Sequence, residues 1–577
     1  MKLVWILGIL YSSAVIAEDA STQSSSQGLE SPKVTVSQGQ LQGLTYRSRK
    51  GNKYYGFLGV PYATTGKVRF NTPQPADNWD GVKLATKFAP HCFQFCLVQQ
   101  RLIGTEDCLT LNVYSPKLDG KLPVMVLLHG GGFQFGSSSF SEAKYFMDED
   151  VILVTLQYRI GALGFLNTED DVVQGNMGLK DQSFALQWIQ ENIAQFGGDP
   201  KSVTIFGYSA GGASVHYQML SPMSKGLFSR AISQSGTALN PWAFQMKPKE
   251  LALRLAENVD CVRDTSEELV ECLRSKTPGE IVTGQLKLSK FPSEFDLISM
   301  LFSPSVEKGT SEPKFISDSP YKLLVEGRLA SDDVPWMSGL TKDEGSFYTA
   351  NILESEKSMQ KLNSDWYKML PNILYYENSA SPATQKRISE KVREFYFGDD
   401  SKITVDKYLE VGRVIGDRFF VNGISRAIRE HAKKYDSPVY PYIFSHDGDE
   451  SIVQSFLHTK KSYGVAHADD LKYLFNKTYG ASEYGLDTDE GKFSDQMVKL
   501  FVSFARDGKP TSTWGSAKLW EPLTLSQDDK TIPTWYEIDT DTKVTSEDPF
   551  KERTDFWESL PLKEMEKEGY PDEKDEL

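Results

Sequence analysis

The sequence lacks the features by which nucleic-acid-binding and membrane-spanning proteins are recognised. It has 63 lysine and arginine residues against 78 aspartate and glutamate, a net charge of −15, and no long basic run. Nucleic acid and anionic membranes attract clustered positive charge, so neither is expected as the main partner. After the first 17 residues, no apolar segment reaches the roughly 18 to 25 residues that a membrane-spanning helix needs.

The sequence also has no internal repeat and no linker that would divide its 577 residues. Hydrophobic residues make up 40% of the chain and aromatic residues 12%, which is enough for a large core without repeats or metals. We therefore expect one globular enzyme domain over residues 33–562, preceded by a flexible serine-rich leader over residues 18–32. We expect no cofactor and no metal.

Both ends of the chain carry targeting signals. Residues 1–17, MKLVWILGILYSSAVIA, have one early lysine, a short apolar stretch and a small-residue ending, which predict a signal peptide cleaved after Ala17. Residues 563–577 form an acidic tail that ends in KDEL, an address read by the retrieval receptor of the endoplasmic reticulum. We expect residence in the lumen, with secretion as the alternative. The sequon at Asn476 predicts glycosylation in that compartment.

Five cysteines enter this oxidising compartment, where pairing is expected. Cys261 and Cys272 flank a short charged helical stretch, VRDTSEELVE, and their closeness predicts a local disulfide. The remaining three are Cys92, Cys96 and Cys108. One of these must stay unpaired, and their spacing does not decide which.

The alternation of apolar runs and helical patterns predicts an α/β fold. LPVMVLL and VILVTL are too short for helices and apolar on both faces, as buried parallel strands are. Between them and the next strand, a helical face formed by Leu186, Ile189, Ile193 and Phe196 ends at a Gly-Gly-Asp-Pro stop. An antiparallel lead-in precedes this region, and a helical insertion is expected from about Leu353 to Lys434. The result is a mostly parallel sheet flanked by helices.

Gly207-Tyr208-Ser209-Ala210-Gly211 matches the G-x-S-x-G pattern and follows an apolar strand. The glycines allow a sharp strand-to-helix turn, which would hold the Ser209 hydroxyl at the N-terminus of a helix. That end carries partial positive charge and free N–H groups, which suit a developing oxyanion. Ser209 is therefore the candidate nucleophile.

His129-Gly130-Gly131-Gly132-Phe133 also follows a buried strand. Consecutive glycines cost conformational entropy, and a close backbone approach explains them. Their N–H groups are candidates to bind an oxyanion together with that of Ala210. His129 itself fits a fixed structural hydrogen bond better than a catalytic base.

A serine nucleophile needs a general base and a carboxylate that orients it. Five of the seven histidines are poor candidates: His91, His431 and His458 are expected to be solvated, His216 points along the helix after Ser209, and His129 is structural. His446 and His467 remain, with some preference for His467. A strand ending in TKDEGSF offers Asp343 and Glu344 as the acid, and the residue pattern does not choose between them.

At this point the sequence resembles the type-B carboxylesterase and lipase family of α/β-hydrolases, which includes the cholinesterases. The matching segments run in order from FLGVPYA through EDCLTLNVYSP, HGGGF, FGYSAGGAS and TKDEGSF to GVAHADDLKYLF. The resemblance implies a triad of Ser209, Glu344 and His467. It also implies oxyanion donors at Gly131, Gly132 and Ala210, and disulfides that join Cys92 to Cys108 and Cys261 to Cys272.

GVAHADDLKYLF looks most like arthropod carboxylesterases, some of which act on juvenile hormone or odorant esters. Two departures bear on substrate: the segment FQFCLVQQRLIGTED lacks the tryptophan that cholinesterases use, and Tyr208 stands where many relatives have an acid. A choline ester would lack both partners for its cation. We expect a serine esterase for neutral, hydrophobic esters. The alternatives are lipase-like or hormone or odorant ester specificity, or a non-catalytic adhesion protein. Cys96 has no counterpart in the family, and the oligomeric state stays open.

Overall fold

The computed structural model describes residues 31–562, apart from 65–68, 98, 290–299, 330–332, 354, 399–401, 458, 477–481, 512–519, 526–531 and 533. The expected signal peptide, most of the serine-rich leader and the acidic tail with its KDEL end lie outside the described residues. Within them, none of the helices is both long and apolar enough to cross a membrane.

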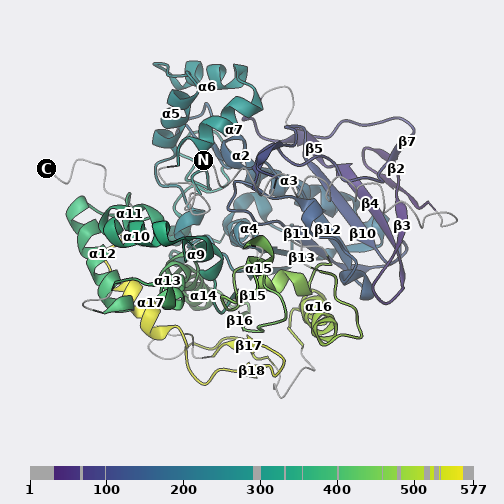
Figure 1. Cartoon of the computed structure of the whole chain (residues 1–577). Helices are drawn as coiled ribbons and strands as arrows, with labels where there is room; N and C mark the ends of the chain where they lie inside the picture. Colours follow the sequence, from purple (N-terminus) through teal and green to yellow (C-terminus); the bar gives the residue numbers. More distant parts are fainter. Residues whose placement is uncertain are drawn as a thin grey trace.

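An eleven-stranded sheet runs through the middle of the molecule (Figure 1). Its parallel strands are, in spatial order, β12 (Ile152–Leu156), β11 (Leu122–Leu128), β13 (Gly198–Tyr208), β14 (Arg230–Gln234), β15 (Trp336–Thr341), β16 (Val439–Phe444) and β17 (Tyr536–Ile538). Antiparallel strands extend both edges: β10 (Thr110–Ser115), β4 (Lys53–Pro61) and β3 (Leu44–Arg47) beyond β12, and β18 (Lys543–Val544) beyond β17. The expected mostly parallel α/β-hydrolase sheet with an antiparallel lead-in is confirmed.

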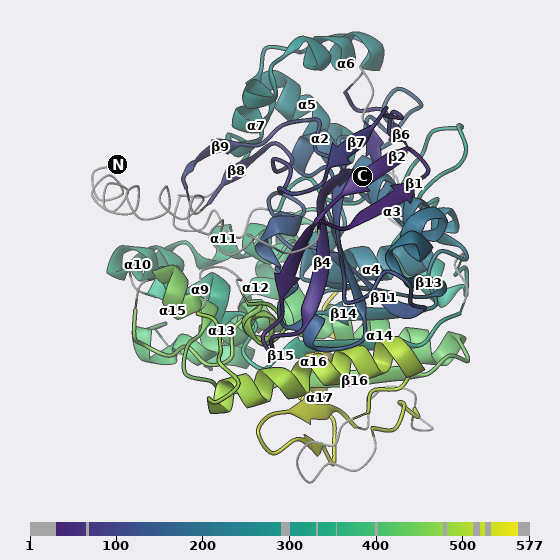
Figure 2. The ribbon, with the colours of Figure 1, turned by 90° about the vertical axis from the view of Figure 1, so that its right-hand side faces the viewer.

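Helices cover both faces of this sheet (Figure 2). Along β11, Val124, Val126 and Leu128 pack in one core cluster, which includes α3 (Met177–Asn192) and α4 (Ala210–Leu220). Met125 and Leu127 alternate with them and pack in a second cluster, which includes α16 (Asp489–Asp507). A strand buried on both faces needs apolar residues at every position, which explains the continuous apolar runs of the sequence.

Two groups of helices are inserted between consecutive strands of the sheet, one before and one after β15 in the sequence. Between β14 and β15 stand α5 (Pro248–Asn258), α6 (Ser266–Ser275), α7 (Pro278–Leu286) and α8 (Pro320–Val325). Between β15 and β16 stand α9 (Ser346–Leu353), α10 (Glu356–Ser364), α11 (Trp366–Ile373), α12 (Pro382–Phe397), α13 (Tyr408–Gly416), a π-helical turn (Asp417–Val421) and α14 (Asn422–Lys434). The expected helical insertion is confirmed and begins slightly earlier, at Ser346.

Other described elements are short. They include the helices α2 (Gly161–Phe165), α15 (Ile452–Leu457) and α17 (Lys551–Glu558). They also include three small sheets, formed by β1 (Lys33–Val36), β2 (Gly39–Gln42) and β7 (Val82–Leu84), by β5 (Ala63–Thr64) and β6 (Gln74–Pro75), and by β8 (Gln94–Cys96) and β9 (Arg101–Ile103).

Two disulfides hold segments outside the main sheet. Cys92 is bonded to Cys108, and Cys261 to Cys272 across α6. These are the two pairs that the family resemblance implies. Cys96, on β8, is a buried free thiol.

Candidate active site

Ser209 stands on a sharp turn between β13 and α4. Its backbone has φ 57° and ψ −124°, a conformation that residues with a side chain adopt only where the surroundings impose it. The surroundings are close, because a Cβ at Gly211 would lie 1.9 Å from the carbonyl oxygen of Leu128 on β11. Only glycine fits there, so this glycine lets α4 approach the neighbouring strand and forces the turn at Ser209.

The turn directs Ser209 to the N-terminus of α4, which begins at Ala210 and has 11 residues. The first N–H groups of a helix have no acceptor within the helix, and the helix dipole makes this end positive. The Ser209 N–H donates to the carbonyl of Gln234 at 2.8 Å, which ties the turn to the end of β14. A negative charge that develops near Ser209 is therefore stabilised.

The glycine-rich segment after β11 lies beside this turn. Leu128, the last residue of β11, pairs with Gly207 of β13. Gly131 and Gly132 have φ of 110° and 58°, and a Cβ at Gly131 would lie 2.0 Å from the carbonyl oxygen of Phe135. Both positions suit glycine alone, and the segment thereby turns its backbone close to the start of α4. We refer to residues 129–133 as the oxyanion loop.

His129 is held rigidly at the start of the oxyanion loop. Its ring stacks on that of Tyr158 at 4.2 Å, and its Nδ1 lies 2.9 Å from the carbonyl oxygen of Gly130. The Tyr158 hydroxyl donates to the His129 carbonyl at 2.7 Å. Burial lowers the pKa of His129 to about 4, so the ring is neutral at physiological pH. His129 is a structural residue, as its sequence position indicates.

Glu344 and His467 meet at the end of the parallel strands. The Nδ1 atom of His467 lies 2.6 Å from Oε2 of Glu344, and both side chains are buried. The other carboxylate oxygen, Oε1, accepts the N–H of Thr341 at 2.9 Å. With both oxygens engaged, the carboxylate cannot rotate, and it fixes the imidazole in one orientation. This is the relation between acid and base that a serine triad requires.

Two further carboxylates hold the loop that carries His467. Asp343 accepts the N–H of Val465 at 3.0 Å, and Asp469 accepts that of Ala466 at 2.7 Å. Asp469 also accepts the N–H of Ile452 at 2.7 Å, which joins the loop to α15. Asp343 therefore has a backbone partner, while its neighbour Glu344 contacts the imidazole.

His446, the other candidate base, is occupied elsewhere. Its Nδ1 lies 3.2 Å from Asp539 and its Nε2 lies 3.1 Å from Glu490. The ring also stacks on Phe493 at 3.9 Å. Neither nitrogen is free to take a proton from Ser209, so the geometry favours His467.

His431 corrects an expectation from the sequence, because it is buried and not solvated. Its ring lies 5.1 Å from that of Trp336 and 4.6 Å from that of Tyr435. Burial lowers its pKa to about 3. His91 is half-buried, and burial lowers its pKa too. His216 lies along α4, where its Nδ1 accepts the N–H of Ala238, and His458 is outside the described residues.

Asp470 is a buried residue near the base that the motif analysis did not identify. Its Oδ2 accepts the Gln234 amide at 2.6 Å, and Gln234 in turn accepts the Ser209 N–H. Burial and the nearby Glu344 raise the pKa of Asp470 to about 7, and burial raises that of Asp469 to about 6. Asp470 thus links the segment after His467 to the turn at Ser209. The paired acids in HADD were the available signal.

The chain is similar to known proteins in sequence and in structure. A model of the carboxylesterase family matches residues 30–557. The chain belongs to the carboxylesterase family. Venom carboxylesterase-6 of Apis mellifera is 34% identical over 93% of this chain and 96% of its own. Juvenile hormone esterase of Tribolium castaneum is 36% identical over 85% of this chain and 87% of its own.

A solved structure also matches this carboxylesterase. It is the crystal structure of juvenile hormone esterase from Manduca sexta with OTFP covalently attached, 28% identical, with a TM-score of 0.79. The match covers 92% of this chain and 99% of the other. This carboxylesterase therefore has the α/β-hydrolase fold and is an enzyme that hydrolyses carboxylic esters.

Aromatic rings surround the imidazole of His467. The His467 ring lies 4.6 Å from that of Phe420 and 5.8 Å from that of Tyr348. Phe420 continues to Trp242 at 5.9 Å, and Trp242 to Phe133 of the oxyanion loop at 6.3 Å. These residues come from four distant parts of the sequence, and no local pattern marked them. They give the site an apolar wall.

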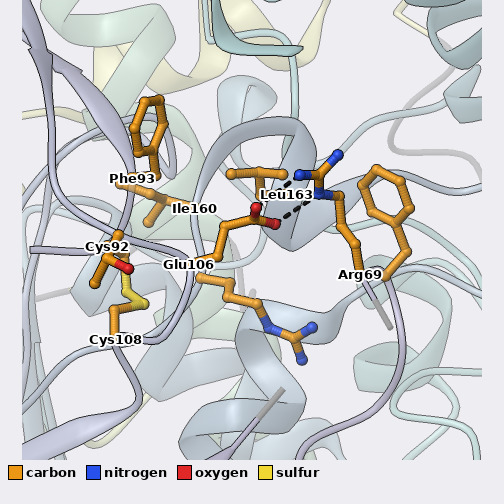
Figure 3. A pocket seen from close by; sticks show the side chains of 10 residues that line it. Arg69, Cys92, Phe93, Glu106, Cys108, Ile160 and Leu163 are labelled. Carbon is orange, nitrogen blue, oxygen red and sulfur yellow. Dashed lines mark hydrogen bonds and ion pairs between the residues drawn. A yellow bond between two sulfur atoms is a disulfide. The ribbon is translucent and has the colours of Figure 1, made fainter. Parts of the chain in front are cut away.

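A small pocket is lined by an ion pair and the first disulfide (Figure 3). Arg69 donates to both oxygens of Glu106 at 2.6 Å. A further guanidinium nitrogen donates to the carbonyls of Leu273 and Lys276 at the end of α6. Arg69 therefore anchors the end of α6 to Glu106. The residues that line the pocket do not include Ser209, Glu344 or His467.

The structure argues against the expected glycan at Asn476. Its side chain is 2% exposed, and its amide donates to Glu142 at 3.2 Å. An amide in this position is not presented to solvent, and a glycan on its nitrogen would break the packing.

Proposed function

We propose that this carboxylesterase cleaves neutral, hydrophobic esters through an acyl-enzyme, with Ser209 as nucleophile and His467 as general base. Glu344 orients the base and stabilises its protonated form. The observation that supports this most directly is the 2.6 Å contact between Glu344 and His467 Nδ1, which leaves Nε2 as the nitrogen for proton transfer.

The reaction proceeds in two halves. His467 Nε2 takes the proton of Ser209 while Oγ attacks the ester carbonyl carbon, and a tetrahedral intermediate forms. Three backbone N–H groups bind its oxyanion, those of Gly131, Gly132 and Ala210. The intermediate expels the alcohol, which takes the proton from His467. Water then attacks the acyl-enzyme with His467 again as base. His467 returns this proton to Ser209 Oγ as the bond to the acyl carbon breaks, and the carboxylic acid leaves.

The apolar wall supports the substrate class. The rings of Phe347, Tyr348 and Phe420 lie 4.6 to 6.1 Å from that of His467, and none is charged. Burial raises the pKa of the Tyr348 phenol well above its usual range, so it stays neutral at any physiological pH. Apolar acyl or alcohol groups would gain from burial here. A choline cation would find neither an acid at position 208, which is tyrosine, nor a tryptophan in the segment FQFCLVQQRLIGTED. Choline esters should be poor substrates.

Hydrolysis of a hormone ester is a second candidate function. It rests on the relatives, since two of them are named juvenile hormone esterases. An epoxy-terpenoid methyl ester is the corresponding test substrate, and the apolar wall is compatible with it.

An activity panel on purified protein tests the proposed function. It would contain short and long p-nitrophenyl esters, a choline ester and the epoxy-terpenoid methyl ester, each with wild type and Ser209→Ala. We expect the substitution to lower kcat about 10⁴-fold or more and to abolish labelling by an organophosphate. Retained activity or labelling would overturn the nucleophile assignment. Preference for emulsified long-chain esters would indicate a lipase, and no activity on any ester a non-catalytic role.

We also propose that the enzyme enters the secretory pathway through residues 1–17 and is retained by its KDEL end. Deletion of the last four residues should move the protein from cells into the medium. Equal secretion of both forms would contradict retention.

A further inference from the structure

The turn at Ser209, between β13 and α4, and the oxyanion loop meet at one aromatic ring, that of Tyr208. Tyr208 is the last residue of β13 and is 2% exposed. A Cβ at Gly130 would lie 2.6 Å from Cε2 and 2.7 Å from Cδ2 of this ring. The Cα of Gly130 is therefore in van der Waals contact with the ring.

The closeness of Tyr208 accounts for the glycine at position 130. Gly131 and Gly132 have positive φ, but Gly130 does not, so its φ does not account for the glycine. What a side chain would meet is the Tyr208 ring and, at 2.7 Å, the Tyr208 carbonyl oxygen. The loop and the residue before Ser209 are thus fitted to each other.

The ring is itself held firmly. It packs in the core cluster that includes Leu127 of β11 and Phe206 of β13. The loop residue before Gly130, His129, is stacked on the ring of Tyr158. The first two residues of the oxyanion loop are therefore each supported by a tyrosine ring. Of these two tyrosines, Tyr208 is the one joined by a peptide bond to Ser209, so it connects the loop to the proposed nucleophile directly.

We propose that Tyr208 is a positioning residue of the oxyanion hole, because its ring supports Gly130 and thereby fixes Gly131 and Gly132 relative to Ser209. This rests on the proposed function, in which those two glycines bind the oxyanion. Donors placed for the oxyanion act on the transition state more than on the bound ester. Loss of the ring should therefore lower kcat and leave KM almost unchanged.

The test compares Tyr208→Leu, which removes the planar ring and keeps apolar bulk, with Tyr208→Phe, which keeps the ring. On p-nitrophenyl butyrate we expect Tyr208→Leu to lower kcat about 10- to 100-fold, with KM within about threefold. Tyr208→Phe should stay within about twofold. Equal kcat in both variants, a loss confined to KM, or an equal loss in Tyr208→Phe would overturn the proposal. Tyr208→Met serves in the same way if Tyr208→Leu does not fold.

A pair of inhibitors separates positioning from general loss of structure. A trifluoromethyl ketone forms a tetrahedral adduct with an oxyanion, whereas the matching methyl ketone binds as a ground-state analogue. Tyr208→Leu should weaken the first by the same factor as kcat/KM and the second by less than about threefold. Equal weakening of both would overturn the proposal. Failure of the proposed function is seen separately, as activity or organophosphate labelling that survives in Ser209→Ala.

Discussion

Replacing Glu344 by glutamine tests the proposed triad sharply, because the structure fixes which way the new amide turns. One oxygen of Glu344 accepts the Thr341 N–H at 2.9 Å, and the other lies 2.6 Å from His467 Nδ1. In the variant, the amide oxygen must stay on the Thr341 N–H, since an NH₂ group there would place two donors face to face. The NH₂ group then faces Nδ1, which must accept.

The consequence is the wrong tautomer of the base. When Nδ1 accepts, the ring proton sits on Nε2, the nitrogen that has to take the proton of Ser209. In serine hydrolases the equivalent change costs about 10⁴-fold in kcat, or about 5 kcal/mol of activation free energy. Glu344→Asp keeps the charge and the tautomer but is too short to span both contacts, so we expect an intermediate loss of about 10²-fold.

The assay is kcat on p-nitrophenyl butyrate, with active sites counted by organophosphate titration. Asp343→Asn is the matched control, because Asp343 is the adjacent carboxylate and accepts the Val465 N–H, as an amide oxygen also can. We expect this variant to stay within about threefold of wild type. The reasoning is refuted if Glu344→Gln keeps more than a tenth of the activity, or if Asp343→Asn loses as much.

Three other substitutions test the buried polar groups. Because burial lowers the pKa of His431 to about 3, the unfolded chain takes up a proton below about pH 6.5 that the native state does not. The free energy of unfolding of His431→Phe, measured in urea, should therefore rise by about 2 kcal/mol relative to wild type as the pH falls from 7.5 to 5. A difference that does not change with pH would contradict this. Asp470, with its pKa raised to about 7, is ionised above neutrality and there favours the protonated form of His467. Asp470→Asn should therefore lower kcat/KM several-fold at pH 8.5 and not at pH 5.5. A wild-type to variant ratio of kcat/KM that does not change with pH would count against this. Asn476→Gln should destabilise the protein by about 1 to 3 kcal/mol without changing its glycan mass, and a mass shift would show that the amide is modified.

Much of the fold could be predicted because its signals are local. The buried strands β11 and β12 are continuous apolar runs, and the turn at Ser209 needs glycines whose contacts leave no room for a side chain. The order of strands in the sheet could not be predicted from these patterns, since strand pairing joins segments far apart in the chain.

The choice between His446 and His467 as the candidate base was harder to make from the sequence, because it depends on distant partners. His446 is excluded by Glu490 and Asp539, and His467 is supported by a carboxylate 123 residues earlier. Neither relation leaves a mark in the local sequence. The family resemblance favours Glu344 over Asp343, and Glu344 is the one of the two that contacts His467 Nδ1.

His431 shows a signal that was present and misread. The charged neighbours in REHAKK favoured a solvated side chain. Ile424, Ile428 and His431 follow one another at spacings of four and three, which puts them on one face of α14. That face packs on the sheet, where Trp336 lies. Periodicity was the better guide than the composition of the flanking residues.

The two sides of the site differ in charge, and the difference follows from which residues hold each loop. On the side of His467, Glu344, Asp469 and Asp470 are all buried, and the backbone N–H groups that two of them accept partly offset the cost of their desolvation. In the proposed mechanism, those carboxylates that are ionised favour the imidazolium that forms when His467 takes the proton of Ser209. On the side of the oxyanion loop, the corresponding support is the uncharged ring of Tyr208.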